Sequence, residues 1–293
     1  MRKINILILL ALLFSSLNLS VNQLAYANEY KIERVTGNVY RFVSGRHRSV
    51  FLVSENGILV TDPLNTRAAT WLKKELKSRF DLPVKYVVYS HNHSDHIYGA
   101  EVFRDSRAVF VSSQLTRQDI IVTRAKTVIP DVTFQEKMNI TLGKNQVELR
   151  YHGPNDGRGS ISMLFKPEKV LFVVDWIVLN RMVWQELWSY DIQGMINSTR
   201  EVLDLDFDLF VGGHSDTGKK ADVQKYLSYI EALYSAVIDG IHSGKNLEQL
   251  KKEVRLEKYS HLENYQEWLP KNIEGVWKRL MNESGMAWRP DID

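Results

Sequence analysis

The sequence predicts an α/β fold with sheet in the interior and a helical segment at the C-terminus. Short β-branched runs dominate the first part of the chain, strand and helix patterns alternate in the middle, and helical spacing continues alone from Ala221 onward. With 293 residues, 44% of them hydrophobic and 25% charged, the chain is long enough to bury a sizeable core. It contains no cysteine, which excludes disulfides, thiolate metal ligands and a cysteine nucleophile.

The first 27 residues have the pattern of a signal peptide. Arg2 and Lys3 form a short basic region, an apolar run follows from Ile6 to Phe14, and Ala25-Tyr26-Ala27 is a small-x-small cleavage pattern. The apolar run is well short of the roughly 20 residues that span a bilayer, which argues against an uncleaved anchor. We therefore expect an exported chain, periplasmic or secreted, that begins at Asn28 and has no stable membrane anchor.

Removing residues 1–27 leaves a nearly neutral chain. Arg2 and Lys3 are the charged residues before Asn28, so 36 of the 38 basic residues remain beside 35 acidic ones. A balance this close to zero does not favour nucleic acid as a partner. The sequence carries no signal for an oligomeric state.

The first part of the chain predicts an antiparallel meander followed by a change of period. Val39 to Val43, Val50 to Val53 and Ile58 to Thr61 are short apolar runs separated by turn residues. Thr66 to Phe80 has the apolar spacing of an amphipathic helix, and Val84 to Tyr89 is again a strand.

The middle of the chain repeats this alternation, which is why we expect a mixed fold with its sheet inside. Gln114 to Ala125 and Met195 to Leu203 have helical spacing. The predicted strands are Ala108 to Val111, Ile140 to Leu142, Val147 to Tyr151, Ile161 to Phe165, Val170 to Val174 and, as the final strand, Leu209 to Val211.

The C-terminal part predicts helices alone. One long amphipathic helix runs from Ala221 to near Gly244, a second begins at an Asn246 cap, and a third passes through Ile273 and Leu280. No linker composition separates this part from the rest, so we expect residues 221–293 to pack on the preceding domain.

Three histidines and an aspartate stand within six residues, just after the predicted strand ending at Tyr89. Neutral imidazoles and carboxylates bind zinc at about 2.0 Å. His91 and His93 can point toward one ion from an extended chain end, while Asp95 and His96, past the bend, reach a second. A chance cluster of surface histidines is the alternative, but three of only eight histidines at this spacing favour a metal site.

This motif, H-x-H-x-D-H followed by Gly99, resembles the signature of the metallo-β-lactamase-fold superfamily. The resemblance extends over roughly residues 28–218, because further residues follow in the family's order. Asp175 stands at the end of a predicted strand, and His214 follows two glycines at another strand end. Asp62 resembles the aspartate that stands behind the metal ligands in the family. Turn residues at strand ends are the alternative reading for Asp175 and His214.

The resemblance implies a four-layer αββα sandwich over residues 28–220, with a C-terminal helical extension over residues 221–293 packed on the same domain. It also implies two Zn²⁺ ions at one edge of the sheets. The implied metal ligands are His91 and His93 for the first ion, Asp95, His96 and His214 for the second, and Asp175 between the two.

One position departs from the family pattern. A third histidine for the first ion is expected in a Gly-Pro loop, where this chain reads His152-Gly153-Pro154-Asn155-Asp156. Asp156 stands in the register of that histidine, and an aspartate can bind zinc. A carboxylate there weakens the Lewis acidity of the ion and also suits iron or manganese. His152 is the alternative ligand if the loop bends differently.

The implied function is that of a metallo-hydrolase in which a metal-bound hydroxide attacks an ester, thioester, lactone or lactam of a small molecule. Asp95 is the expected catalytic residue, because it can orient that nucleophile. An iron-dependent oxidoreductase of the same fold and a non-catalytic metal-binding or ligand-binding protein are the alternatives, and β-lactamase activity is not the favoured one. Four aromatic residues after Asp175 are expected either to wall a substrate pocket or to pack in the core: Trp176, Trp184, Trp188 and Tyr190.

Overall fold

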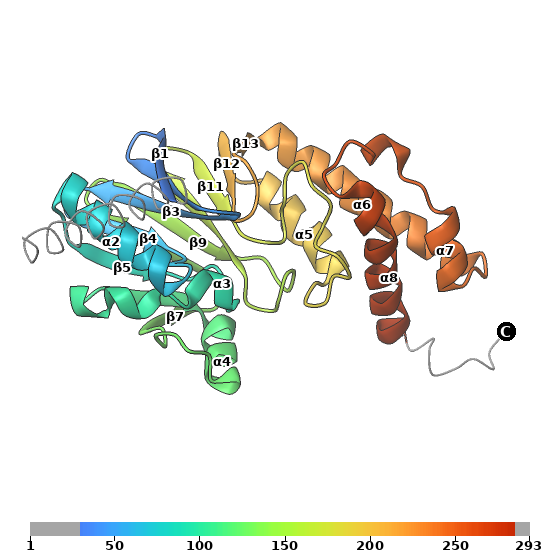
Figure 1. The fold of residues 1–293 in the computed structure, drawn as a ribbon, viewed down its shortest axis with the longest axis horizontal. Helices are drawn as coiled ribbons and strands as arrows, with labels where there is room; N and C mark the ends of the chain where they lie inside the picture. The colour runs from blue at the N-terminus through green and yellow to red at the C-terminus, as the bar shows by residue number, and fades with distance from the viewer. Residues whose placement is uncertain (1–29, 285–293) are drawn as a thin grey trace, which may run out of the picture.

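The computed structural model describes residues 30–284, and Figure 1 shows two sheets flanked by helices. The predicted signal peptide and the predicted start at Asn28 lie outside the described residues. Within residues 30–284, no helix combines the length and the apolar character needed to cross a membrane.

The first sheet has seven strands in chain order, and its first half is the predicted antiparallel meander. The later strands pair in parallel, since a helix crosses back between each of them. The strands are β1 (Tyr30–Thr36), β2 (Val39–Ser44), β3 (His47–Ser54), β4 (Gly57–Thr61), β5 (Val84–Val88), β6 (Val109–Ser113) and β7 (Val132–Phe134). The connecting elements are α2 (Thr66–Phe80), α3 (Ser94–Ile97), the 3₁₀ segment η1 (Ala100–Ser106) and α4 (Gln114–Thr123).

The second sheet has six strands in the order β13-β12-β11-β10-β9-β8. Its neighbours are antiparallel except β11 and β12, which are parallel and joined through the crossover helix α5 (Ile192–Leu203). The strands are β8 (Lys137–Leu142), β9 (Asn145–Tyr151), β10 (Ile161–Lys166), β11 (Val170–Val173), β12 (Leu209–Gly212) and β13 (Gly218–Lys219).

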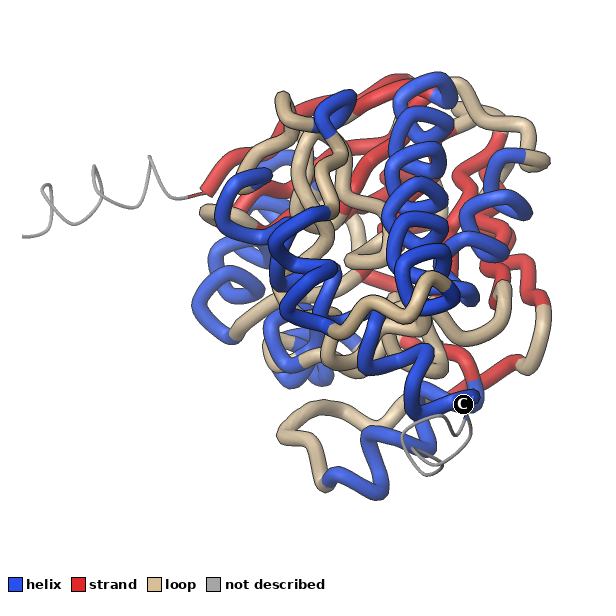
Figure 2. Tube along the Cα trace, turned by 90° about the vertical axis from the view of Figure 1, so that its right-hand side faces the viewer, coloured by secondary structure: helices blue, strands red, loops and turns tan. Residues whose placement is uncertain are grey.

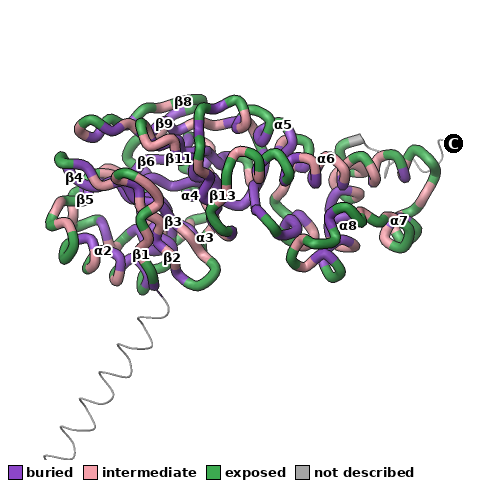
Figure 3. Tube along the Cα trace, turned by 90° about the horizontal axis from the view of Figure 1, so that it is seen from above, coloured by how far each residue is buried: buried purple, intermediate pink, exposed green. Residues whose placement is uncertain are grey.

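Three apolar cores separate four layers, which confirms the predicted αββα sandwich. The middle core lies between the two sheets, and the outer cores lie between each sheet and its helices. Strand β10 shows how the sequence builds this: Ile161 and Met163 face the middle core, while Leu164 faces the helices. Buried residues therefore run along the strands, with exposed residues on the outer helices and loops (Figure 3).

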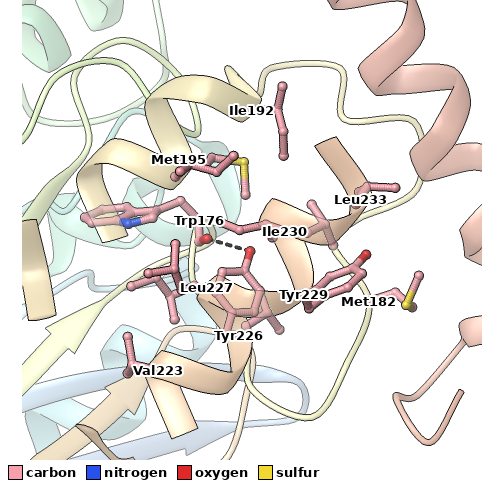
Figure 4. Close-up of a cluster of buried hydrophobic side chains, with 14 of the residues drawn as sticks. Trp176, Met182, Ile192, Met195, Val223, Tyr226, Leu227, Tyr229, Ile230 and Leu233 are labelled. Carbon is pink, nitrogen blue, oxygen red and sulfur yellow. Dashed lines mark hydrogen bonds between the residues drawn. The ribbon is translucent and has the colours of Figure 1, made fainter. Parts of the chain in front are cut away.

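The helical end of the molecule shares one continuous core with the second sheet. Helices α6 (Lys220–His242), α7 (Leu247–Glu253) and α8 (Tyr265–Ser284) lie in front of the strands in Figure 2. Figure 4 shows this core, where the Tyr226 hydroxyl donates to the Trp176 carbonyl over 2.7 Å. Leu171 of β11 and Ile273 of α8 belong to the same buried cluster.

Several elements differ from the prediction for local reasons. Leu209–Gly212 is not the final strand, because the two-residue β13 follows it and is too short to leave a pattern. Strands β1 and β7 were also missed. Helix α5 begins at Ile192 rather than Met195, because the Asp191 side chain accepts a hydrogen bond from the Gly194 amide and caps the helix.

Candidate metal centre

The histidine motif follows β5, and its loop is held against the loop that follows β4. Leu64 N donates to the His96 carbonyl and Gly99 N donates to the Leu64 carbonyl, each over 2.8 Å. A Cβ at Gly99 would lie 2.4 Å from the Pro63 carbonyl oxygen, so the close approach requires glycine. This contact brings the two loops that carry metal-site residues side by side.

Two aspartates at strand ends turn their carboxylates into the same region. Asp62 follows β4 with φ 33°, and Asp175 comes shortly after β11 with φ 67°. Aspartate adopts this left-handed backbone more readily than most residues do. The predicted strand-end aspartates therefore lie in tight turns and also face the histidines.

The first group of potential metal ligands comprises His91, His93, Asp156 and Asp175, whose donor atoms all lie within 4.8 Å of one another. Asp175 Oδ2 is 3.1 Å from His91 Nε2 and 3.2 Å from His93 Nδ1. Asp156 Oδ2 is 3.8 Å from His93 Nδ1. These atoms surround one position that is suited to a cation.

The second group lies beside the first and shares Asp175 with it. His96 Nε2 and His214 Nε2 are 3.0 Å apart, and Asp175 Oδ1 is 3.0 Å from His214 Nε2. Asp95 Oδ2 lies 3.5 Å from His96 Nε2 and 3.6 Å from His214 Nε2. Asp175 thus offers one carboxylate oxygen to each group, and the structure brings all seven predicted ligands together.

Buried atoms without partners fit metal ions at these positions. Asp156 Oδ2 is buried and accepts no hydrogen bond from residues 30–284. The His96 and His214 nitrogens face each other, and two imidazole nitrogens at this distance satisfy each other only if one carries a proton. Divalent cations would satisfy these nitrogens and carboxylates together.

A second row of hydrogen bonds, made by residues behind the potential metal ligands, holds the imidazole rings and carboxylates in position. His91 Nδ1 lies 2.8 Å from Ser90 Oγ, and the Ser90 amide donates to Asp62 Oδ1 over 2.7 Å. His214 Nδ1 lies 3.1 Å from the Arg46 carbonyl oxygen, which leaves its Nε2 facing the site. Ser189 Oγ donates to Asp156 Oδ1 over 2.6 Å. Such contacts orient metal ligands.

The pKa values of the metal-free groups reflect their crowding. Burial lowers the pKa of His91 to about 3. Burial also acts to lower the pKa of His96, but the carboxylates of Asp175, Asp62 and Asp95 raise it to about 9. Burial and the nearby Asp175 raise the pKa of Asp156 to about 7. A metal ion would therefore have to displace protons from His96 and Asp156.

The structure places Asp156, not His152, beside the histidine motif. His152 lies at the end of β9, where its Nε2 is 2.7 Å from Ser162 Oγ and its Nδ1 is 2.9 Å from Glu201 Oε2. Both of its ring nitrogens thus have partners outside the two ligand groups.

His47 belongs to the centre but was missed by the sequence interpretation. It begins β3, and its Nε2 lies 3.1 Å from Asp95 Oδ2. With Asp95 and His214 it forms a third group of potential metal ligands. A single histidine at a strand start matches no motif, so the contact became visible only in the fold.

A cavity of about 540 Å³ opens onto the centre and decides between the two readings of the aromatic residues. Trp184, Trp188 and Tyr190 line it, whereas Trp176 is fully buried in the core. The remaining lining residues are Arg46, His47, His93, Asp95, Asp175, Arg181, Ser189 and His214.

Comparison with known proteins agrees with this fold. The family model described as the metallo-beta-lactamase superfamily matches residues 44–214, a segment that contains both ligand groups. The 2,4-dinitroanisole O-demethylase subunit alpha of Nocardioides sp. (strain JS1661) is 25% identical over 224 residues, which are 74% of this chain and 67% of that protein. A solved structure, the metallo-beta-lactamase from Pontibacter korlensis, superposes with a TM-score of 0.63 at 18% identity, covering 69% of this chain and 99% of its own. Since the family match spans more than half of the residues and the fold agrees, this chain belongs to the metallo-beta-lactamase superfamily.

Proposed function

We propose that the chain is an exported metallo-hydrolase that holds two divalent ions, zinc in the first instance. The observation that carries this proposal is the shared carboxylate of Asp175, which offers Oδ2 to one ligand group and Oδ1 to the other. A buried carboxylate placed between two sets of imidazoles is the arrangement expected of a dinuclear site.

His91, His93 and Asp156 would hold one ion, Asp95, His96 and His214 the other, and Asp175 both. When bound, such ions supply Lewis acidity and lower the pKa of a coordinated water to around 7. The second row of hydrogen bonds keeps the ligand atoms aimed inward without rearrangement.

Asp95 is the proposed catalytic residue. Partial burial opposes ionisation, but the hydrogen bond from His47 and the nearby His96 and His214 lower the pKa of Asp95, so its carboxylate is ionised at neutral pH. Asp95 Oδ2 lies 3.1 Å from His47 Nε2 at the cavity floor, and this ionised carboxylate can orient the attacking nucleophile by accepting a hydrogen bond from it.

A small molecule with an ester, thioester, lactone or lactam group is the proposed substrate. The cavity of about 540 Å³ is large enough for such a molecule. Export rests on the signal-peptide pattern, and N-terminal sequencing of the secreted or periplasmic protein would test it by finding Asn28 first.

An iron-dependent oxidoreductase is the second candidate. A carboxylate at position 156 adds a hard ligand that suits iron. The 25% identical relative is named an O-demethylase, so a methyl aryl ether such as 2,4-dinitroanisole belongs in the substrate screen. Oxygen consumption during turnover would favour the oxidoreductase, and turnover without oxygen would favour the hydrolase.

Metal analysis of the desalted protein beginning at Asn28 tests the proposal most directly. Two zinc ions per chain, together with turnover in an ester, thioester, lactone and lactam screen, are expected. If the unmodified protein holds one ion and Asp156→His holds two, the part of the site that contains Asp156 has lost its capacity to bind an ion in this chain. Bound metal without turnover of any substrate would favour the non-catalytic alternative.

A further inference from the structure

Arg181 is a buried cation in the wall of the cavity, and no ion pair or hydrogen bond to its side chain is formed within residues 30–284. The residue is 8% exposed, and its Nε is completely enclosed without a hydrogen-bond partner. The carboxylates of Glu263 and Asp175 act on it electrostatically, but neither lies within ion-pair distance. This pattern differs from that of the arginines at the surface, such as Arg158, which pairs with Asp119.

The guanidinium of Arg181 keeps its proton and its positive charge despite its burial. Burial lowers the pKa of Arg181, yet an arginine stays protonated at neutral pH in proteins. An unpaired buried charge is costly, and buried charges are normally paired or bound to a ligand. Arg181 also lines the cavity, so an anionic ligand there can pair with the guanidinium.

Backbone hydrogen bonds of the neighbouring residues and an aromatic ring hold Arg181 in position. Met182 N donates to the Glu263 carbonyl over 3.1 Å, and Glu263 N donates to the Asn180 carbonyl over 2.9 Å. Figure 4 shows the neighbouring Met182 in the core. The guanidinium lies over the Trp268 ring of α8, 5.5 Å from its centroid. A fixed cation loses little freedom on binding a ligand.

Aromatic side chains beside Arg181 offer flat apolar surfaces to a ligand. Trp184 is 43% exposed and packs edge-on against Trp268, with ring centroids 5.1 Å apart. Trp188 is 85% exposed on the same cavity. Such exposure of large aromatic rings is typical of binding surfaces. The same cavity is also lined by His93, Asp95 and His214 of the metal centre.

We propose that Arg181 binds the carboxylate of an aromatic carboxylate substrate, whose ring lies against Trp184 and Trp188 and whose reactive group lies over the metal centre. The planar guanidinium matches a carboxylate with two parallel hydrogen bonds. The assignment of a reactive group rests on the proposed hydrolase function, whereas carboxylate binding at Arg181 does not. Helix α8 then has a role in specificity, since its Trp268 contacts both Arg181 and Trp184.

Calorimetric titration of the zinc-loaded protein with benzoate and with benzamide tests this assignment without turnover. We expect benzoate to bind about tenfold or more tightly than uncharged benzamide, the order of a hydrogen-bonded charge. Arg181→Met should remove this preference and leave benzamide binding unchanged. Arg46→Met is the matched control, because Arg46 is a solvent-exposed arginine of the same cavity, and we expect less than a threefold change.

The variants distinguish Arg181 from the metal ions as the group that binds the carboxylate. If the carboxylate bound to zinc instead, Arg181→Met would keep the preference for benzoate, and the proposal would be wrong. If Arg181→Met weakened the binding of benzoate and benzamide equally, Arg181→Lys would decide. A retained preference for benzoate would support a positive charge at position 181 as its cause, and a lost preference would overturn the proposal. Absence of hydrolytic turnover would contradict the proposed function while leaving these binding results intact.

Discussion

Two regions of the molecule bury polar side chains in opposite ways. At the helical end, the Tyr229 hydroxyl donates to Asn272 Oδ1, and Asn272 Nδ2 donates to the Val183 and Gln185 carbonyls over 3.0 and 2.7 Å. At the metal centre, the nitrogens of His96 and His214 face each other and carboxylates crowd around them.

The difference shows which burial stabilises the fold and which prepares it for a ligand. A polar group whose hydrogen bonds are complete can stay buried at little cost, whereas an incomplete cluster is destabilising until something binds. We therefore expect changes at the helical end to alter stability, and changes at the metal centre to alter ligand binding and activity.

The largest effect should come from Asp175→Ala. Because Asp175 contacts both ligand groups, its loss should reduce the metal content below two ions per chain and lower activity by about 10³-fold, as for other groups that act on the transition state. Elemental analysis and steady-state kinetics measure these effects.

Asp206→Ala is the control, since Asp206 pairs with Lys169 on the surface. It should keep both ions and full activity. Two ions retained by Asp175→Ala would contradict the bridging role.

Asn272→Ala should destabilise the protein by about 3 kcal/mol. It removes the acceptor of the Tyr229 hydroxyl proton and the donor to one buried and one part-buried carbonyl group, and each buried group left unsatisfied costs about 1–3 kcal/mol before relaxation. Denaturant unfolding measures the loss. Asn282→Ala, on the exposed side of the same helix, should change stability by less than about 0.5 kcal/mol. Equal effects of the two variants would disprove the role of the network.

Asp62→Asn should weaken metal binding by about 10–100-fold with little loss of stability, since Asp62 stands behind a ligand rather than in the ligand groups. Its Oδ1 accepts from the Ser90 amide, which an asparagine oxygen can still do, but the charge 3.6 Å from His96 Nδ1 is lost. Competition with a chelator measures the affinity. In Asp131→Asn, which keeps a similar contact to the Phe110 amide away from the site, affinity should stay within twofold.

The sequence predicted most where the signal is local. The meander, helix α2 and the long helix α6 follow strong apolar periods, and the motif places His91 to His96 in one loop. Asp175 and His214 were expected from the family resemblance, and the structure brings them to the same place.

What the sequence did not predict depends on contacts between distant segments. His47 meets Asp95 because β3 lies beside the motif loop, and Arg181 is enclosed because α8 packs over it. Neither residue stands in a pattern of its own. The position of Asp156 was expected from register alone, and the loop fold then placed His152 with Ser162 instead of the ligands.

The smallest predicted effect is a pH dependence confined to the metal-free protein. Burial opposes the charge of His96, but Asp175, Asp62 and Asp95 raise its pKa to about 9, and the pKa of His93 is raised as well. A raised pKa in the folded state stabilises the fold fully below the ordinary value of 6.5, and this stabilisation is lost as the pH rises through 9. We expect the metal-free protein to unfold about 2–4 °C lower at pH 9 than at pH 6.5, which corresponds to about 1 kcal/mol. Thermal unfolding of metal-free His96→Gln should lack most of this drop. The metal-loaded protein should also lack it, because its His96 is neutral at both pH values. An equal drop in the metal-free protein, the metal-free variant and the metal-loaded protein would place the titrating group outside the metal centre.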